Sequence, residues 1–233
     1  MSLPGAPSLF FLAYLFVVLP WAAFRSARVL GAARAAAQPM SRESIWIRTV
    51  ANLGLLLVLA IFVGRGFDFS IFAAPPLGPR EWGWAAGALG VTLLLRLALR
   101  VLRPEEERRR LLVYFLAPRS GREWTWTVVA ILFAGVAEEA AYRGVAMNIL
   151  WYGLGNPWLA AVLCALAFAL AHWMQGWKSG VFIFVLALVF HGLVALTGTL
   201  VLAMVVHVVY DLIAARWIAR DAATLRADGV LPA

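Results

Sequence analysis

Long apolar runs, separated by short polar stretches, follow one another along most of the 233-residue chain. We expect seven of them to be membrane-spanning helices, because each approaches or exceeds the roughly 20 residues that cross a bilayer. Runs of this length do not fit the alternating ten-residue strands of an outer-membrane barrel. The seven runs are residues 8–24, 46–64, 82–102, 124–150, 157–175, 179–197 and 199–218. The predicted fold class is therefore all-α, a polytopic integral membrane protein.

Composition excludes a soluble protein and a disordered one. Hydrophobic residues make up 64% of the chain and charged residues only 14%, with a mean hydropathy of +0.86. Soluble domains are about 45–50% apolar and about 25% charged. The spans leave little room for a separate soluble domain, so we divide the chain into N-terminal helices with a cytoplasmic loop (1–123), a core (124–218) and a cytoplasmic tail (219–233). The run Glu105–Arg110 in that loop is expected to form a short helix with acid–base pairs.

The positive charges fall on one side of the predicted spans. Counting Lys and Arg in alternate loops gives 16 on one side and only Arg65 and Arg80 on the other. This bias predicts an N-terminus outside and a C-terminus in the cytoplasm. The net charge of +8 therefore reflects membrane orientation. Nucleic-acid binding is not expected, because no basic face with interleaved aromatic residues lies outside the spans. The single cysteine, Cys164, is expected to be a buried core residue.

Ionisable residues inside the spans are the main functional signal. A charged group at the centre of a bilayer costs about 2.5–3.5 kcal/mol on insertion scales, so its presence requires a partner or a function. Almost all such groups fall in the second half of the chain, in the fourth, fifth and seventh predicted spans. They are Glu138, Glu139, Arg143, His172, His207 and Asp211. His191, in the sixth span, is expected to be an interhelical hydrogen-bonding residue.

Helical spacing sorts these residues into pairs. Glu139 and Arg143 are four residues apart on one helix face, where they can neutralise each other. Glu138 is rotated by about 100° from Glu139, so it is left without a cation and becomes a candidate general base. His207 and Asp211 are again four residues apart. We therefore expect one intramembrane pocket that draws side chains from three helices.

The predicted span boundaries set a geometric condition on this pocket. Glu138 falls near the middle of the fourth span, whereas His172 falls near the cytoplasmic end of the fifth. At about 1.5 Å per residue, their depths differ by about 10–20 Å. The two side chains can share a pocket only if the fifth span is extended or if the helices are staggered or tilted.

Two chemistries fit this set of residues. Glu138, His172, His207 and Asp211 resemble a zinc ligand set with an open position for water, whereas the same groups without a metal could activate water through a carboxylate. No His-Glu-x-x-His run is present. Only one aspartate lies within a span, and serines occur only near span ends. An aspartate dyad and a serine protease of the rhomboid type are therefore excluded.

Three motifs in order resemble those of the CPBP (Abi/CAAX prenyl protease) family of intramembrane proteases. They are Glu138-Glu139-x-x-x-Arg143, Phe168-x-x-x-His172 and His207-x-x-x-Asp211, the last preceded by the turn Thr197-Gly-Thr-Leu200. The resemblance covers about 124–218. It implies cleavage of peptide bonds in or near the membrane, with water activated by Glu138 and His172. It also implies a supporting role for Glu139 and Arg143, and an oxyanion-stabilising role for His207 and Asp211.

Asp211 departs from the version of the motif that has Asn at this position. An ionised Asp cannot donate a hydrogen bond to an oxyanion, whereas Asn can. Asp211 is therefore protonated, orients His207 or helps to hold a metal. The family is described both as metalloproteases and as metal-free glutamate proteases, so Zn²⁺ stays open as a cofactor.

Substrate and location follow from the same resemblance. The expected partners are the lipid bilayer and a peptide or protein substrate, either a prenylated CAAX tail, a C-terminal sorting tail or a bacteriocin-like peptide. The Arg-rich, Lys-poor composition is typical of a GC-rich bacterial source and favours the inner (plasma) membrane. Two other functions stay open: a non-catalytic immunity or scaffold factor with the same fold, and a proton-coupled transporter. No sequence feature indicates an oligomeric state.

Overall fold

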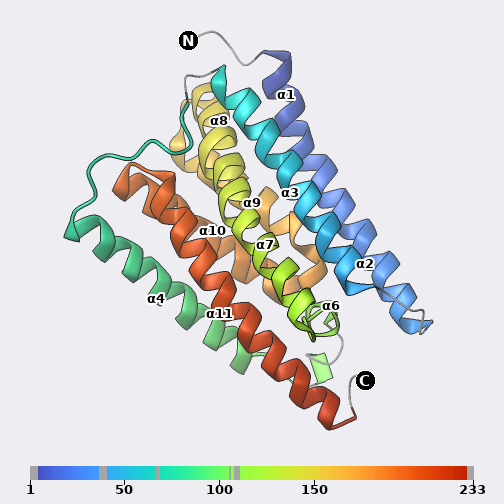
Figure 1. Ribbon diagram of the computed structural model, residues 1–233. Helices are drawn as coiled ribbons and strands as arrows, with labels where there is room; N and C mark the ends of the chain where they lie inside the picture. Colours follow the sequence, from blue (N-terminus) through green and yellow to red (C-terminus); the bar gives the residue numbers. More distant parts are fainter. Residues whose placement is uncertain (1–4, 37–40, 67–68, 105, 108–110, 230–233) are drawn as a thin grey trace.

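The computed structural model describes residues 5–36, 41–66, 69–104, 106–107 and 111–229, and these residues form helices and connecting turns without a strand (Figure 1). In chain order the elements are α1 (Ala6–Ala13), η1 (Tyr14–Val18), α2 (Leu19–Ala35), α3 (Arg42–Arg65), α4 (Pro79–Val101), α6 (Leu112–Phe115), α7 (Gly121–Glu138), η2 (Glu139–Ala146), α8 (Met147–Leu154), α9 (Pro157–Ala171), η3 (Trp173–Gln175), α10 (Trp177–Thr197) and α11 (Leu200–Ala227). The η1 and η2 segments are π-helical and η3 is a 3₁₀ turn.

The prediction of a multi-pass helical membrane protein is confirmed. Among the described residues, five helical stretches are long and apolar enough to cross a membrane: Ala6–Ala35, α3, α4, α10 and α11. The helix α9 is apolar but shorter. The run α7–η2–α8 is continuous from Gly121 to Leu154 and carries the charged residues of the predicted fourth span. The count of seven spans and the orientation of the termini stay predictions, although α1 begins and α11 ends at opposite ends of the bundle (Figure 1).

Several predicted boundaries were wrong. The first helix continues to Ala35, so Arg25, Arg28 and Arg34 lie on α2 and not in a loop. The cause is that arginine and alanine are good helix formers, so charge ends an apolar run without ending the helix. For the same reason α11 continues to Ala227, well into the predicted tail. Of the predicted helix in the 103–123 loop, Glu105 and 108–110 lie outside the described residues.

The centre of the bundle is the helix that carries α7 and η2. It packs against α3 on one side and α11 on the other, while α4 packs on α10 and α11 at the far edge. The first helix, Ala6–Ala35, packs against α9 with its α2 segment (Figure 1). Small residues such as Ala137, Ala140 and Ala141 are fully buried at this centre, where they allow close helix packing.

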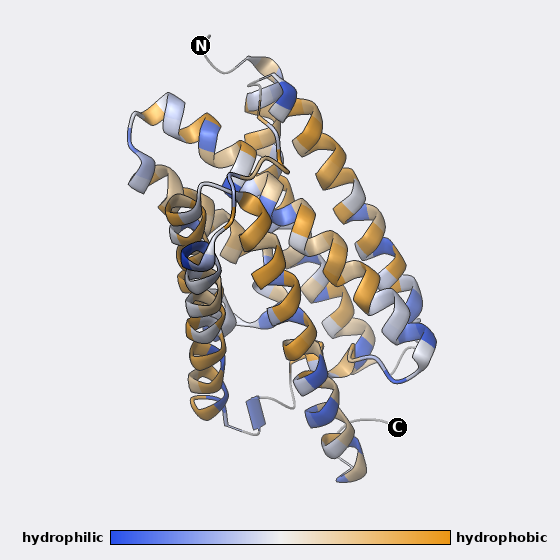
Figure 2. Cartoon of the chain, turned by 60° about the vertical axis from the view of Figure 1, so that its left-hand side comes forward, coloured by the Kyte–Doolittle hydropathy of each residue, from blue (hydrophilic) through white to orange (hydrophobic). Residues whose placement is uncertain are grey.

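Large apolar side chains cover the outside of the bundle. Phe10 is 76% exposed and Trp158 is 81% exposed, and the helices are largely apolar along their length with blue, hydrophilic residues concentrated toward the ends (Figure 2). Such a surface is suited to contact with lipid. Cys164 is fully buried, as predicted.

Short polar side chains define where the helices of the second half begin. Ser120 accepts a hydrogen bond from the Glu123 amide at the start of α7, and Asn156 accepts bonds from the first turn of α9. At the start of α11, Thr199 Oγ1 accepts from the Val201 amide and donates to the Ala73 carbonyl oxygen at 2.9 Å. The turn before α11 is thereby attached to the segment that precedes α4.

Candidate active site

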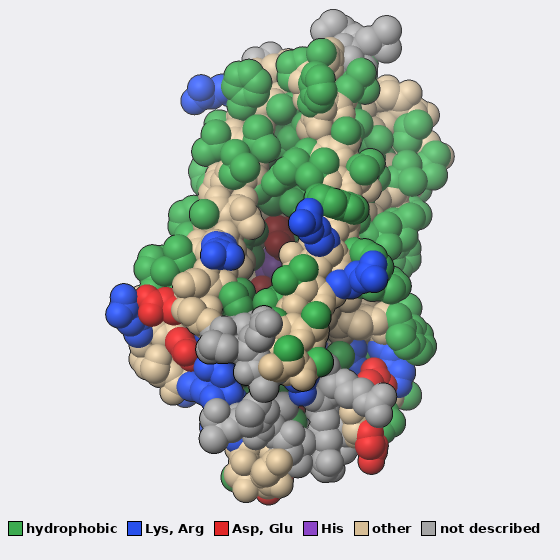
Figure 3. Space-filling view, turned by 90° about the vertical axis from the view of Figure 1, so that its right-hand side faces the viewer, with side chains coloured by type: hydrophobic (Ala, Val, Ile, Leu, Met, Phe, Trp, Pro, Cys, Tyr) green, Lys and Arg blue, Asp and Glu red, His purple; other side chains and the backbone are tan. Residues whose placement is uncertain are grey.

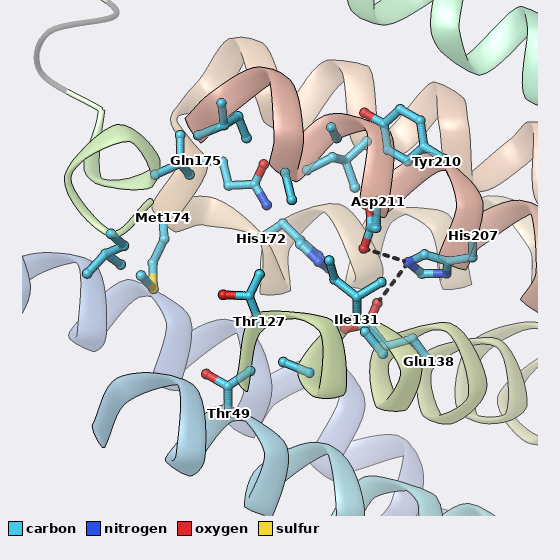
Figure 4. Close-up of a pocket in the computed structure, with 18 of the residues that line it drawn as sticks. Thr49, Thr127, Ile131, Glu138, His172, Met174, Gln175, His207, Tyr210 and Asp211 are labelled. Atoms are coloured by element: carbon cyan, nitrogen blue, oxygen red, sulfur yellow. Dashed lines mark ion pairs between the residues drawn. The ribbon is translucent and has the colours of Figure 1, made fainter. Parts of the chain in front are cut away.

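A pocket of about 400 Å³ opens within the bundle, and four of the six predicted site residues line it, whereas Glu139 and Arg143 do not. Glu138 from the end of α7, His172 from the end of α9, and His207 and Asp211 from α11 all line it. Figure 4 shows these four side chains facing one another across the same space. The sequence expectation of one shared pocket therefore agrees with the geometry.

Glu138 and His172 line the same pocket, so the depth difference expected from the predicted spans does not separate them. The predicted span ran to residue 175, but α9 ends at Ala171, and His172 is the residue that caps it. The chain leaves the helical path at His172, which has φ −101° and ψ 16°, and turns through η3 toward α10. The helix thus ends beside the pocket, which His172 lines together with Glu138.

A close approach of two helices positions the two halves of the site. Gly135 lies one turn before Glu138, and a Cβ atom there would stand 2.5 Å from Cγ2 of Val208 and 3.3 Å from the carbonyl oxygen of Met204. Val208 directly follows His207 in α11. The absence of a side chain at Gly135 therefore allows α7 and α11 to approach closely enough for the carboxylates to reach the histidine.

His207 is the centre of the polar contacts. Its Nδ1 lies 2.8 Å from Oε1 of Glu139, while its Nε2 lies 3.5 Å from Oδ2 of Asp211 and 3.7 Å from Oε2 of Glu138. The carboxylate of Glu139 can only accept at this distance, so Nδ1 carries a proton. This bond fixes the plane of the ring and directs Nε2 into the pocket.

Glu139 is held in turn by Arg143. Both side chains are fully buried, and Nη1 of Arg143 lies 3.2 Å from Oε1 of Glu139, as their spacing predicted. The guanidinium also lies over the ring of Phe168, 4.4 Å from its centroid, and 5.5 Å from that of Phe190. These aromatic faces stabilise a cation that has been removed from water.

The contact between Glu139 and His207 was missed by the sequence reasoning. Helical spacing relates Glu139 only to Arg143. Glu139 and His207 are 68 positions apart in the sequence, so no helical period connects them. The structure instead shows a chain of contacts, Arg143 to Glu139 to His207. Glu139 and Arg143 lie in the π-helical segment η2, all eight residues of which are buried. Such segments are rare and are often found at functional sites.

His172 has a defined tautomer. Its Nδ1 lies 2.7 Å from the carbonyl oxygen of Phe168, which is four residues earlier in α9. A carbonyl oxygen only accepts, so Nδ1 carries the proton and the neutral ring keeps an unprotonated Nε2. The ring also packs on Phe168, with centroids 4.5 Å apart. His172 therefore presents a hydrogen-bond acceptor, and its neighbours fix the orientation of the ring.

The donor set does not match a preformed metal site. Within the described part of the chain, no three His, Cys, Asp or Glu side chains are grouped as ligands of one ion. Of the four candidate ligands, His207 has its Nδ1 bonded to Glu139, and its Nε2 faces Glu138 and Asp211 at 3.7 and 3.5 Å. We therefore derive no chemical step through zinc.

His191 lies apart from this constellation. It is buried in α10 and does not line the pocket. The expected interhelical hydrogen bond is not seen at its Nε2, which has no partner among the described residues.

Several further polar residues in the pocket wall were not identified from the sequence as site residues, and Arg96 and Tyr210 are two of them. Arg96 of α4 and Tyr210 of α11 both line the pocket and contact each other. Arg96 lies inside the predicted span 82–102, and no spacing rule connects it with the second half of the chain.

The pocket is accessible from the side of the bundle. Figure 3 shows a hollow on the face where α2 and α3 lie, with acidic and histidine side chains at its floor and Lys or Arg side chains around it. Four residues of α3 line this side of the pocket: Ile45, Trp46, Thr49 and Leu53. The pocket therefore has an opening on the side of the bundle.

Comparison with known proteins agrees with the motif analysis. Residues 120–213 match the family model described as "Type II CAAX prenyl endopeptidase Rce1-like". This match begins at the residue that caps α7 and ends two residues after Asp211, so it contains all six predicted site residues. The resemblance to CAAX-type intramembrane proteases is thus confirmed for this region. No curated protein and no solved structure matches the chain.

Proposed function

We propose that the protein is an intramembrane endopeptidase in which Glu138 activates a water molecule. One observation carries this proposal: Glu138, His172, His207 and Asp211, from three helices, line a single pocket inside a membrane protein. Substrates of this proposed enzyme are C-terminal tails or small peptides at the membrane, and they enter through the lateral hollow.

In the proposed first step, the water lies between Glu138 and His172. The Glu138 carboxylate accepts one proton from this water, and Nε2 of His172 accepts a hydrogen bond from the other. The water oxygen attacks the carbonyl carbon of the scissile peptide bond. Glu138 then returns its proton to the leaving amine, so that the carboxylate is regenerated for the next cycle.

In the same step, His207 stabilises the negative charge that develops on the carbonyl oxygen. Its Nδ1–H is held by Glu139, so in the doubly protonated ring Nε2–H points toward the pocket and can donate to this oxyanion. Arg143 holds Glu139 and acts through it. Oδ2 of Asp211 lies 3.5 Å from Nε2 of His207, and in this proposal Asp211 orients the ring. Of the three roles considered for Asp211, this contact supports orientation of His207.

The experiment is cleavage in reconstituted membranes. A library of quenched fluorescent peptides is offered to the wild type, to Glu138→Gln and to Glu43→Gln, with and without a zinc chelator. Glu43 is a matched control, since its carboxylate lies outside the pocket in an ion pair with Arg122 at 2.8 Å. We expect Glu138→Gln to lose about 10²- to 10⁴-fold in rate, and Glu43→Gln to retain activity.

Each result of this experiment has a defined meaning. Cleavage that requires Glu138 and resists the chelator supports the metal-free mechanism. Cleavage that the chelator removes supports zinc and overturns the water activation described above. An active Glu138→Gln variant contradicts the proposed mechanism. If cells keep the biological effect of this protein when it carries Glu138→Gln, and the folded variant cleaves no peptide, the result favours a non-catalytic membrane factor of the same fold.

A further inference from the structure

Arg96 is an unusual residue in the wall of the pocket. Among the described residues it is the only Lys or Arg that lines the pocket, whose other lining residues are mainly apolar. Tyr210, from α11, is its contact there. No carboxylate of the described residues forms an ion pair with it.

The next arginine of the same helix provides a contrast. Arg100 lies one turn later in α4, outside the pocket, and its Nη2 is 3.1 Å from Oδ1 of Asp221. Arg96 and Arg100 both border a second, small cavity, which Asp221 also lines, yet among the described residues Asp221 pairs only with Arg100. Asp221 thus neutralises Arg100, whereas Arg96 has no counter-ion among the described residues, although an arginine within a membrane helix is costly.

Charge in the pocket determines what Arg96 can bind. The two carboxylates that line the pocket, Glu138 and Asp211, repel an anionic group. Such a group is therefore favoured only beside a positive charge, which Arg96 supplies. A guanidinium presents a planar pair of donors that matches a carboxylate, and the hydroxyl of Tyr210 offers a third donor beside it. The match is to an anion of the substrate and not to a neutral apolar side chain.

On the basis of the proposed function, we propose that Arg96 binds a carboxylate group of the peptide substrate and thereby determines specificity. The carboxylate is held at the wall formed by α4, while the scissile bond lies at Glu138. Arg96 therefore selects peptides with a carboxylate at a fixed distance from the cleaved bond. The carboxylate is either the free C-terminus or an Asp or Glu side chain, and the experiment distinguishes these sources.

The test measures binding separately from cleavage. Three dansyl-labelled peptides with the core Gly-Leu-Val-Ala-Leu are used: one with a free carboxylate, one with a C-terminal amide, and one amide in which Asp replaces Ala. Each is titrated into the Glu138→Gln protein in phosphatidylcholine nanodiscs, so that neither turnover nor anionic lipid contributes. Energy transfer from tryptophan, including Trp46 of the pocket, reports binding.

We expect the free-acid peptide, the Asp peptide or both to bind about tenfold or more tightly than the plain amide. Arg96→Gln removes the difference, Arg96→Lys keeps part of it, and Arg100→Gln keeps all of it. Preference for the free acid alone identifies the C-terminus as the source, and preference for the Asp peptide identifies a side chain. Equal binding of all three peptides, or no binding of any, overturns the proposal.

Cleavage of the same peptides separates this proposal from the proposed function. With Glu138 intact, Arg96→Gln is expected to raise KM for the carboxylate peptide about tenfold or more while kcat changes little. Cleavage without any carboxylate preference retains the peptidase and rejects the role of Arg96. Carboxylate-selective binding without cleavage supports Arg96 and contradicts the peptidase.

Discussion

The first and second halves of the bundle place their charges in opposite ways. On α2, Arg25 and Arg28 are exposed and lie over the rings of Trp21 and Phe24, at 5.4 and 5.7 Å from the ring centroids. In the second half, the side chains of Glu139 and Arg143 are fully buried and His207 is nearly so.

The difference shows what each half is built to do. An exposed arginine at a helix end keeps its contact with water or headgroups, so it costs little and contributes to orientation. A buried ion pair has lost its hydration, and it persists only with well-placed partners. The first half therefore serves as a wall, with α3 lining one side of the pocket, and the second half holds groups whose positions depend on one another.

The largest expected effect comes from breaking the buried pair. Arg143→Met leaves Glu139 as an uncompensated buried charge, and we expect a loss of about 3–5 kcal/mol in the free energy of unfolding. The control is Arg100→Met, which breaks an exposed pair and should cost about 0–1 kcal/mol. Unfolding in detergent micelles, followed by tryptophan fluorescence, measures both.

A double variant sharpens this prediction. Glu139→Gln combined with Arg143→Met removes both charges, and it should recover much of the stability lost in Arg143→Met alone. Equal losses for Arg143→Met and Arg100→Met would show that burial does not distinguish the two regions.

A smaller effect is expected at the contact between α7 and α11. Gly135→Ala places a methyl group where Val208 and the Met204 carbonyl already lie, and we expect a loss of about 1–3 kcal/mol together with reduced cleavage. Gly87→Ala in α4 is the matched control, because a Cβ there meets nothing within 4 Å. Thermal unfolding and peptide cleavage measure both variants; a neutral Gly135→Ala would refute the close approach.

The smallest effect concerns the ion pairs at the end of the bundle. Oε2 of Glu107 lies 2.6 Å from Nζ of Lys178, and Oε1 lies 3.3 Å from Nε of Arg103. The hydrogen bond from Lys178 lowers the pKa of Glu107 below its ordinary value of 4.5. A lowered carboxyl pKa stabilises the folded state above the unfolded pKa, and this contribution is lost as pH falls through the folded pKa.

The corresponding variant is Glu107→Gln. It should reduce stability by less than about 1 kcal/mol at pH 7, because the pair is partly exposed. The difference from the wild type should disappear as the pH falls through the lowered pKa of Glu107 in the folded protein. Unfolding midpoints measured across this pH range test the assignment, and a difference that is independent of pH would contradict it.

Local features of the site could be predicted from the sequence, and its long-range contacts could not. The pairs Glu139–Arg143 and His207–Asp211 follow from helical periodicity, which depends only on residues four positions apart. The bond between Glu139 and His207 depends on how two distant helices pack. So does the end of α9 at Ala171, since the apolar run continues beyond it while the backbone turns.

The N-terminal half illustrates the same limit. Hydropathy indicated its apolar stretches, yet it could not separate the end of a span from the end of a helix on α2. It also gave no reason to connect Arg96 with Tyr210, because α4 and α11 are far apart in the chain and meet only in the folded bundle.

The short helix α9 has a consequence for the membrane itself. Its 15 residues extend about 22 Å, whereas the hydrocarbon layer is about 30 Å thick. The missing length is taken up by the turn that follows His172, whose backbone groups require hydration or protein partners that lipid tails do not provide. An α9 that crosses the membrane would therefore need a thinner bilayer or water beside it, and that water would lie next to the half-buried His172.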